Sequence, residues 1–389
     1  MAAANWKEHD MLSVGSILDD KFVIEKKISQ GGYGQVFHAK LLKPIAIPLK
    51  SGLLSAGESV AIKLESKQLK RSVLREEREV LKKLVTSKYF MKVLDFGECS
   101  DFLYLVQTIG GIDLLKYVRS KPNRCVSFEV CFRLSLQMIR SLEYLHNAGF
   151  IHRDVKLSNY LLDQNTNDLL NVLKLIDFGI CKRFRRLDGS IKSPSPKGTV
   201  SYIGTYSYSS IRAQELNDVC QGDDLVSVYY SIITMINRKL LPWREVKDKA
   251  EILRLKKKFD VAKVHSNFPK QIEIALNMYY NNVSYLVYYH EPDYEKLYKI
   301  FNSVLKSWNI DEVNTPFEWQ KQIINLETTD KNQSQIDDPI YINKILSAKL
   351  NSAMINGIKT KSKMLEEPGS DEDIMSSKYY FSRFRCIKS

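Results

Sequence analysis

The spacing of apolar and polar residues divides the chain into a strand-rich first part and a helix-rich second part. Residues 20–40 alternate as two strands around a glycine-rich turn, and further strands are predicted at 59–65, 89–96 and 102–108. Residues 67–84 carry leucine and valine at helical spacing and predict a helix. The first part is therefore expected to be a small sheet accompanied by one helix.

The pattern changes to helices after Gly110 and Gly111. Helices are predicted at 113–119 and 128–148, and residues 211–320 are again mostly helical. Short strand candidates lie among the intervening loops, at 150–151, 160–162 and 172–176. This order predicts an α+β fold with a small β-rich lobe followed by a larger, mainly helical lobe.

Shifts in composition place the boundaries of these parts. The expected divisions are an N-terminal extension at 1–19, a first lobe at 20–110, a second lobe at 111–320 and a tail at 321–389. The tail is polar and poor in aromatic residues, so it is predicted to be largely flexible. Its acidic stretch 366–373 precedes Ser376 and Ser377. Two interpretations stay open, a solvated tail and a tail that is phosphorylated and folds back on the body.

Composition favours an intracellular globular protein with acidic partners. Of the 389 residues 44% are hydrophobic, and the six cysteines contain no CxxC pair, which is typical of reduced thiols. The N-terminus shows no apolar leader, and the longest apolar run, 225–236, is too short to span a bilayer. A formal net charge of +13 suits acidic protein segments, anionic lipid or nucleic acid, although no nucleic-acid motif accompanies it. A cytoplasmic or nuclear location is expected.

Four short motifs carry candidate chemistry. Residues 29–36, SQGGYGQV, form a glycine-rich turn that lets backbone approach phosphates closely, although many hairpins are equally rich in glycine. Residues 60–63, VAIK, end a strand with a lysine, which in isolation is an ordinary edge residue. Residues 152–159, HRDVKLSN, follow the long helix, and residues 175–179, LIDFG, place an acid at the end of an apolar strand.

Together and in this order, the four motifs resemble the signature set of protein kinases over residues 20–320. The resemblance implies the bilobal protein-kinase fold and transfer of the ATP γ-phosphate to a protein. The Lys156 variant of the loop argues for serine or threonine as acceptor, because tyrosine kinases usually carry Ala-Ala-Arg there. ATP and Mg²⁺ are the implied cofactors, and a monomer is expected.

The resemblance also implies roles for single residues. Asp154 would accept the proton of the substrate hydroxyl, and Lys156 would contact the γ-phosphate. Asn159 and Asp177 would hold two magnesium ions through oxygen ligands. Lys63 would hold the α- and β-phosphates and be fixed by Glu77, with Glu76 as an ordinary surface charge. The other implied nucleotide-binding positions are Ile28, Gly31, Gly34, Val36, Ala61, Thr108 and Ile109.

Further stretches are similar to the casein kinase 1 group, and within it to the tau-tubulin kinase branch. The chain lacks the usual Ala-Pro-Glu, and the likeness lies in VLREEREVLKKL, in LPWREVKDKAEILRLKKKF at 241–259 and in EPDYEKLYKIF at 291–301. The resemblance implies that residues 152–159 form the catalytic loop and that Asp224 holds this loop in place. It also implies a preference for acidic or phosphorylated substrate segments.

A doubled phrase, GTVSYIGTYSYSS, begins at Gly198 and is open to two alignments. Counting from Gly204 to Asp223 needs no gap against the tau-tubulin kinase pattern, and makes Thr205 the catalytic hydroxyl that bridges Asp154 and Lys156. Counting from Gly198 needs six extra residues further on. The second copy is the better match, and the first would then be an insertion.

Three departures from the family pattern bear on function: Ser29, Leu157 and Ser207, or Ser201 in the other alignment. Ser207 replaces an arginine that helps relatives bind acidic or phosphorylated residues. Nearby basic residues provide a different acidic-sequence site or merely a solvated face; they are Lys182, Arg183, Arg185, Arg186 and Lys256, Lys257 and Lys258. The alternative to an active enzyme is a pseudokinase that binds nucleotide or partners through the same fold.

Overall fold

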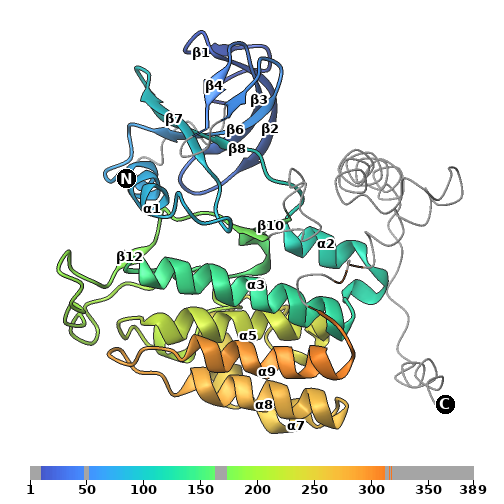
Figure 1. The fold of residues 1–389 in the computed structure, drawn as a ribbon. Coiled ribbons are helices and arrows are strands. Elements are labelled where there is room, and N and C mark those ends of the chain that lie inside the picture. The colour runs from blue at the N-terminus through green and yellow to red at the C-terminus, as the bar shows by residue number, and fades with distance from the viewer. Residues whose placement is uncertain (1–9, 48–51, 163–172, 312–314, 316, 318–389) are drawn as a thin grey trace, which may run out of the picture. The chain divides into compact units, whose positions relative to one another are not determined.

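The structure is a computed structural model that describes residues 10–47, 52–162, 173–311, 315 and 317. The first lobe is built on a six-stranded antiparallel sheet in the order β1-β2-β3-β6-β8-β7 (Figure 1). Its strands are β1 (Ile17–Leu18), β2 (Phe22–Gln30), β3 (Gln35–Leu41), β6 (Ser59–Ser66), β7 (Val93–Glu98) and β8 (Phe102–Thr108). The expected N-terminal extension and tail lie partly or wholly outside the described residues.

Alternation along the strands explains how this sheet makes a core. Buried Phe37 and Ala39 of β3 alternate with half-buried Val36 and His38, since successive side chains point to opposite faces. Strand β6 repeats the pattern, with Val60, Ile62 and Leu64 fully buried. One face therefore packs as the lobe's core, while the other presents the residues of the candidate site.

The described residues between β3 and β6 contain a short two-stranded pairing. Strands β4 (Ile45–Ala46) and β5 (Leu53–Leu54) are antiparallel, with Ile45 opposite Leu54. Both of these side chains are only partly buried, and they pack against the core of the main sheet. Strands of two residues are too short to show an alternation of apolar and polar positions, so β4 and β5 could not be predicted from the sequence.

Helix α1 (Val73–Lys83) begins six residues later than the helical periodicity predicted. Ser72 ends the preceding loop and caps the helix, because its Oγ accepts from the N–H of Arg75 at 3.2 Å. The carboxylate of Glu65 on β6 accepts from the N–H groups of Val73 and Leu74 at 2.8 and 2.7 Å. A cap supplied by a neighbouring strand is a tertiary feature, so periodicity alone placed the start too early.

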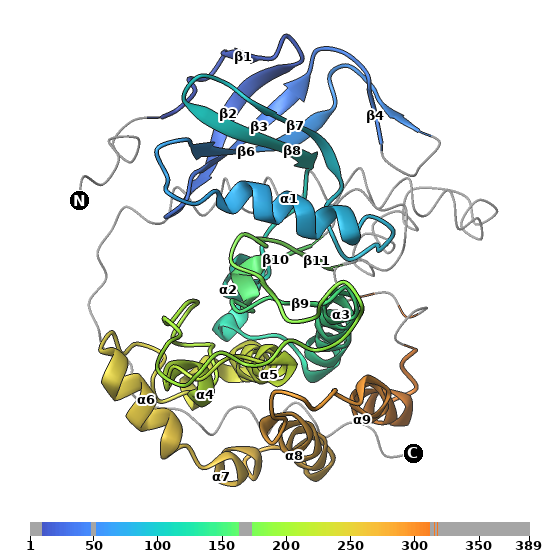
Figure 2. The same cartoon turned by 90° about the vertical axis from the view of Figure 1, so that its left-hand side faces the viewer.

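The second lobe consists mainly of helices that pack around α3 (Phe128–Asn147) and α5 (Gln221–Asn237). Figure 1 shows α3, α5 and α9 lying side by side, and Figure 2 shows the same helices end-on. The remaining helices are α2 (Leu114–Ser120), α4 (Ile211–Gln214), α6 (Lys249–Lys257), α7 (Val261–His265), α8 (Lys270–Ser284) and α9 (Tyr294–Ser307). Nearly every residue of α5 is buried, which accounts for the mostly apolar run at 225–236.

Short strand pairs carry the loops that face the first lobe. Strand β9 (Phe150–Ile151) pairs with β12 (Lys182–Arg183), and β10 (Tyr160–Leu162) pairs with β11 (Leu173–Leu175). The catalytic-loop motif lies between β9 and β10, and the Asp-Phe-Gly motif lies between β11 and β12. The two strand pairs therefore bring both motifs to one side of the helical lobe.

The expected α+β arrangement, a β-rich lobe followed by a helical lobe, is confirmed. One further strand prediction was wrong in its limits: β7 begins at Val93, whereas a strand was expected from Tyr89. Tyr89 and Phe90 are instead buried between elements, and Phe90 forms an isolated bridge with Leu175. No helix in the described part of the chain is long and apolar enough to cross a membrane.

Candidate active site

The carboxylate of Asp224, in the first turn of α5, binds the backbone of the catalytic loop at residues 152–159. One carboxylate oxygen accepts from the backbone N–H of His152 at 2.7 Å, and the other accepts from that of Arg153 at 2.9 Å. The ring of His146 on α3 lies 2.9 Å from the same carboxylate. Burial raises the pKa of Asp224, but these partners outweigh it and leave the pKa below its ordinary value. Asp224 is therefore a buried anion that orients the loop, as the resemblance implied.

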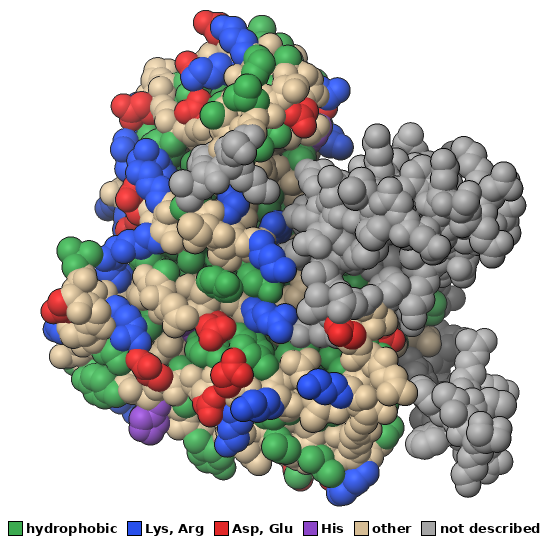
Figure 3. Space-filling view, in the orientation of Figure 1, with side chains coloured by type: hydrophobic (Ala, Val, Ile, Leu, Met, Phe, Trp, Pro, Cys, Tyr) green, Lys and Arg blue, Asp and Glu red, His purple; other side chains and the backbone are tan. Residues whose placement is uncertain are grey.

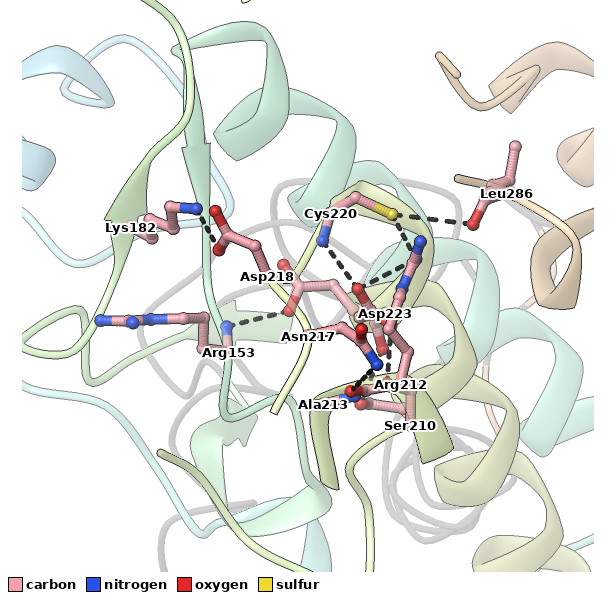
Figure 4. A network of polar contacts seen from close by, with 12 residues as sticks. Arg153, Lys182, Ser210, Arg212, Ala213, Asn217, Asp218, Cys220, Asp223 and Leu286 are labelled. Atoms are coloured by element: carbon pink, nitrogen blue, oxygen red, sulfur yellow. Dashed lines mark hydrogen bonds and ion pairs between the residues drawn. The ribbon is translucent and has the colours of Figure 1, made fainter. Parts of the chain in front are cut away.

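A second network fixes the start of α5 and the segment before it (Figure 4). Asp223 accepts from the hydroxyl of Ser210 at 2.6 Å, from the N–H of Cys220 at 2.7 Å, and pairs with Arg212 at 3.0 Å. Ser210 in turn caps α4. The two adjacent aspartates therefore hold different segments. Asp223 holds the segment that follows Thr205, and Asp224 holds the catalytic loop.

Two residues of the site have left-handed backbone conformations that are unfavourable for non-glycine residues. Arg153 and Asp177 both have φ of 71°. The Arg153 conformation is fixed by Asp224, and its side-chain Nε donates to the carbonyl of Ile180, just after the Asp-Phe-Gly motif. Such strain persists only where surrounding contacts over-determine the backbone, and it concentrates at functional sites.

Asp154, Lys156 and Thr205 form a closed triangle of hydrogen bonds. The Thr205 hydroxyl donates to Asp154 Oδ1 at 2.6 Å, and Lys156 Nζ donates to Asp154 Oδ2 at 2.7 Å and to Thr205 Oγ1 at 2.9 Å. Thr199, in the first copy of the doubled phrase, is exposed and donates only to the carbonyl of Pro196. The structure therefore brings the second copy, not the first, to the catalytic loop.

Gly204 makes this approach possible. Its φ is 115°, and a Cβ placed on it would lie 2.5 Å from the carbonyl oxygen of Arg153. Any side chain at this position would push the following threonine away from Asp154. A glycine before Thr205 is thus required by close backbone contact.

Lys63 connects the two lobes through two carboxylates. It pairs with Glu77 of α1 at 2.5 Å and with Asp177 at 3.0 Å, while Glu76 pairs with Arg71 at the surface. Burial lowers the pKa of Lys63, but the charges of Asp177 and Glu77 outweigh it, so the pKa lies above its ordinary value. The ammonium is therefore a fixed positive charge, suited to holding phosphate oxygens.

Asn159 and Asp177 fit the expected magnesium ligands. The Asn159 amide nitrogen donates to the carbonyl oxygen of Asp154 at 2.9 Å, so its amide oxygen is the atom left for a ligand. The Asp177 side chain is 46% exposed, and Lys63 lowers its pKa, which keeps the carboxylate charged. Two oxygen ligands suit Mg²⁺, which completes its shell with water and substrate phosphates. Among the described residues no cluster of three His, Cys, Asp or Glu suitable for a metal occurs.

Three of the expected nucleotide-binding positions, Val36, Ala61 and Lys63, lie on the same face of the sheet. Val36 lies directly opposite Lys63, and Ala61 lies opposite Gln107 beside Thr108 at the end of β8. Further positions line the glycine turn and the connection between lobes: Ile28, Gly31, Gly34 and Ile109. The Gly31 N–H donates to the carbonyl of Gly34 at 2.9 Å and closes the turn. A Cβ on Gly34 would lie 1.9 Å from the carbonyl oxygen of Leu64, so the turn packs tightly on β6.

The basic residues near the site do not form one solvated face. Lys256 is only 3% exposed, so its assignment to a surface basic cluster was wrong. Lys182 pairs with Asp218, and Lys257 pairs with Glu215 at 2.5 Å. The described surface in Figure 3 likewise shows Lys and Arg interspersed with Asp and Glu.

Asp218 is a structural contact that sequence reasoning missed. Its buried carboxylate accepts from Lys182 of β12 and from the N–H of Ser195 at 2.7 Å, and Figure 4 shows its pairing with Lys182. It therefore fixes the segment that precedes the first copy of the doubled phrase. Nothing in the local sequence distinguishes Asp218 from other loop aspartates, since its partners lie 36 and 23 residues away.

Comparison with known proteins identifies the family. The protein kinase domain family matches residues 22–307. A "probable serine/threonine-protein kinase" of Dictyostelium discoideum is 32% identical over 310 residues, which cover 80% of this chain and 58% of that protein. A Caenorhabditis elegans protein, also named as a serine/threonine-protein kinase, is 25% identical over 316 residues. These residues cover 80% of this chain and 86% of that protein. The chain thus spans little more than half the length of the first relative, and it belongs to the protein kinase family.

Proposed function

We propose that this chain is an active serine/threonine protein kinase that transfers the γ-phosphate of ATP to protein substrates. The observation that carries the proposal is the closed triangle of Asp154, Lys156 and Thr205. It coexists with the ion pairs from Lys63 to Glu77 and Asp177, so base, cations and candidate metal ligands are assembled together. The names of the two relatives support serine and threonine as the acceptors.

The proposed reaction follows from these positions. The substrate hydroxyl oxygen attacks the γ-phosphorus of ATP, its proton passes to the Asp154 carboxylate, and the bond to the bridging oxygen breaks to release ADP. Lys156 is held 2.7 Å from Asp154, where its charge can stabilise the transferring phosphoryl group. Lys63 orients the remaining phosphates. Magnesium held by Asn159 and Asp177 would neutralise charge that develops on the phosphate oxygens.

Membership of the casein kinase 1 group, near the tau-tubulin kinase branch, is part of the proposal. It is supported by the register of Gly204 and Thr205 with Asp223 and by the absence of Ala-Pro-Glu. We propose acidic protein segments as substrates on the strength of the net charge of +13. Recognition of phosphorylated residues would need a cation other than an arginine at Ser207.

Transfer of labelled phosphate from ATP·Mg²⁺ to an acidic, serine-rich protein tests the activity. The wild type is expected to label the protein, and Asp177→Asn is expected to lower the rate by roughly 10²-fold or more, because a charged oxygen ligand is lost. Lack of transfer by the wild type, or equal transfer by the variant, contradicts the proposal. Nucleotide binding without transfer would instead support the pseudokinase alternative.

A further inference from the structure

Lys256, near the end of α6, is a buried lysine that the proposed reaction does not use. Lys256 is 3% exposed, and its Nζ lies 4.5 Å from the ring centroid of Tyr230 and 5.2 Å from that of Trp243. Within the described residues no carboxylate lies at ion-pair distance from it, in contrast to Lys63. Burial alone holds the pKa of Lys256 well below its ordinary value.

The hydrogen bonds of Lys256 go to one backbone segment. Nζ donates to the carbonyl oxygen of Tyr206 at 2.7 Å and to that of Ser209 at 2.5 Å. We call residues 206–209 the floor segment. It begins directly after Thr205, whose hydroxyl contacts Asp154.

Other donors hold the floor segment from the same helical lobe. Trp243 Nε1 donates to the carbonyl of Ser207 at 2.9 Å, and Gln214 Nε2 donates to that of Tyr206, also at 2.9 Å. From the first copy of the doubled phrase, the ring of Tyr202 stacks on Tyr206 with centroids 3.9 Å apart. The segment is a turn in which the N–H groups of Tyr208 and Ser209 donate to the carbonyl of Thr205 at 3.0 Å. Its carbonyl groups point outward from that turn, and those of Tyr206, Ser207 and Ser209 are satisfied by side chains of the helical lobe.

Burial of a lysine that has no carboxylate partner lowers the stability of the fold. Moving an ammonium out of water is costly, and apolar residues of similar volume often serve the stability of a fold as well or better. The flexible apolar chain of methionine would pack against Tyr230 and Trp243 without that penalty. Stability alone therefore does not explain a lysine at position 256. Its contacts instead indicate a role in shaping the floor segment.

The floor segment lies where a substrate chain must pass. A target hydroxyl has to come within hydrogen-bond reach of Asp154, and Thr205 already contacts that carboxylate. The residues that flank the target serine or threonine therefore come over the segment that follows Thr205. Displacement of that segment would misplace the acceptor while leaving the Lys63 side of the site intact.

We propose that Lys256 is a positioning residue for the protein substrate: by binding two carbonyl oxygens it fixes the floor segment against which the acceptor chain lies. The inference rests on the proposed kinase function. It assigns to a buried lysine an effect on the acceptor that is separate from nucleotide binding.

Kinetics of Lys256→Met in the full chain, with a serine-containing acidic peptide and ATP·Mg²⁺, test this role. The KM for peptide is expected to rise about tenfold, because two hydrogen bonds to the segment are lost. The KM for ATP is expected to stay unchanged, and the melting temperature to change little, because relief from burying the lysine amine offsets the two lost hydrogen bonds. Lys263→Met is the control, since Lys263 is exposed on the next helix, α7, and lies outside the basic residues considered for substrate binding; it is expected to behave as wild type.

An unchanged KM for peptide in Lys256→Met overturns the inference. A lower melting temperature with parallel loss of ATP and peptide binding also overturns it, because that result describes a merely structural residue. If Lys256→Met does not fold, Lys256→Gln, which keeps a neutral donor, is judged by the same two constants. Absence of transfer by the wild type would instead refute the proposed function, so the two failures are distinguishable.

Discussion

The two copies of the doubled phrase, residues 198–202 and 204–208, differ little in sequence and greatly in environment. Thr205 donates to Asp154, whereas Thr199 donates to a neighbouring carbonyl at the surface. A Cβ on Gly204 would strike the catalytic loop, whereas a Cβ on Gly198 would meet nothing within 4 Å. The comparison shows that the same local chemistry becomes a site only where the fold brings a base to it.

The first copy is not simply idle. Its Tyr202 stacks on Tyr206 of the second copy and donates through its hydroxyl to Ser209. Residues of the first copy therefore cover part of the floor segment. Three sets of substitutions test how far the two copies and their surroundings differ in function and stability.

Loss of the threonine hydroxyl should separate the copies most clearly. Thr205→Ala removes the bridge between Asp154 and Lys156, and we expect kcat to fall by roughly 10²-fold, because the base and the cation lose their mutual orientation. Thr199→Ala should leave kcat unchanged, and Thr205→Ser should restore most of the activity. Steady-state phosphate transfer measures all three. A larger loss in Thr199→Ala than in Thr205→Ala would reverse the assignment of the copies.

Replacement of each glycine by alanine should affect stability unequally. Gly204→Ala combines a φ of 115° with a clash against Arg153, and we expect a loss of about 2–3 kcal/mol in the free energy of unfolding. Gly198→Ala has a φ of 80° but open space, and we expect a loss of about 1 kcal/mol. Denaturant titration of both variants measures the difference. Equal losses would show that the catalytic loop moves aside without penalty.

The smallest effect is expected from the contact that holds the segment before the first copy. Burial raises the pKa of Asp218, but bonds from Lys182 and Ser195 outweigh it and lower the pKa. Because the folded protein holds the proton less tightly than the unfolded chain, this stabilisation is present above the unfolded pKa. It is lost as the pH falls through the lower folded pKa.

Asp218→Asn should therefore reduce the free energy of unfolding at neutral pH by about 1 kcal/mol and flatten its fall with acid. Unfolding curves at a series of pH values measure the slope. Asp101→Asn, at an exposed position in the first lobe, is the control and should keep the wild-type slope. An unchanged slope in Asp218→Asn would mean that its contact with Ser195 does not stabilise the fold.

Much of the site could be predicted because kinase chemistry requires certain residues at fixed places along the chain. Lys63, Asp154, Asn159 and Asp177 stand in four short motifs, and the structure brings all of them to the same side of the two lobes. Glu77 was preferred to Glu76 from its alignment in α1, and only Glu77 contacts Lys63. Local spacing was sufficient here because each motif lies on one strand, turn or helix.

Other features depended on residues far apart in the chain. Periodicity placed the start of α1 too early, because Ser72 caps the helix before Val73 and Glu65, on a neighbouring strand, accepts from its first two N–H groups. Lys256 looked like part of a surface run of lysines, since its neighbours in sequence are exposed. Burial against Tyr230 and Trp243 could not be read from that run.

The sequence by itself determined the two-lobed architecture, the protein kinase resemblance and the identity of the catalytic motifs, because periodicity and motif spacing are local properties. Only the tertiary structure decided which glycine-threonine pair is at the active site, and that Asp218 and Lys256 hold the segments around it. The physical reason is that a hydrogen bond to a distant backbone group depends on how the chain packs. Two nearly identical phrases can therefore have different roles.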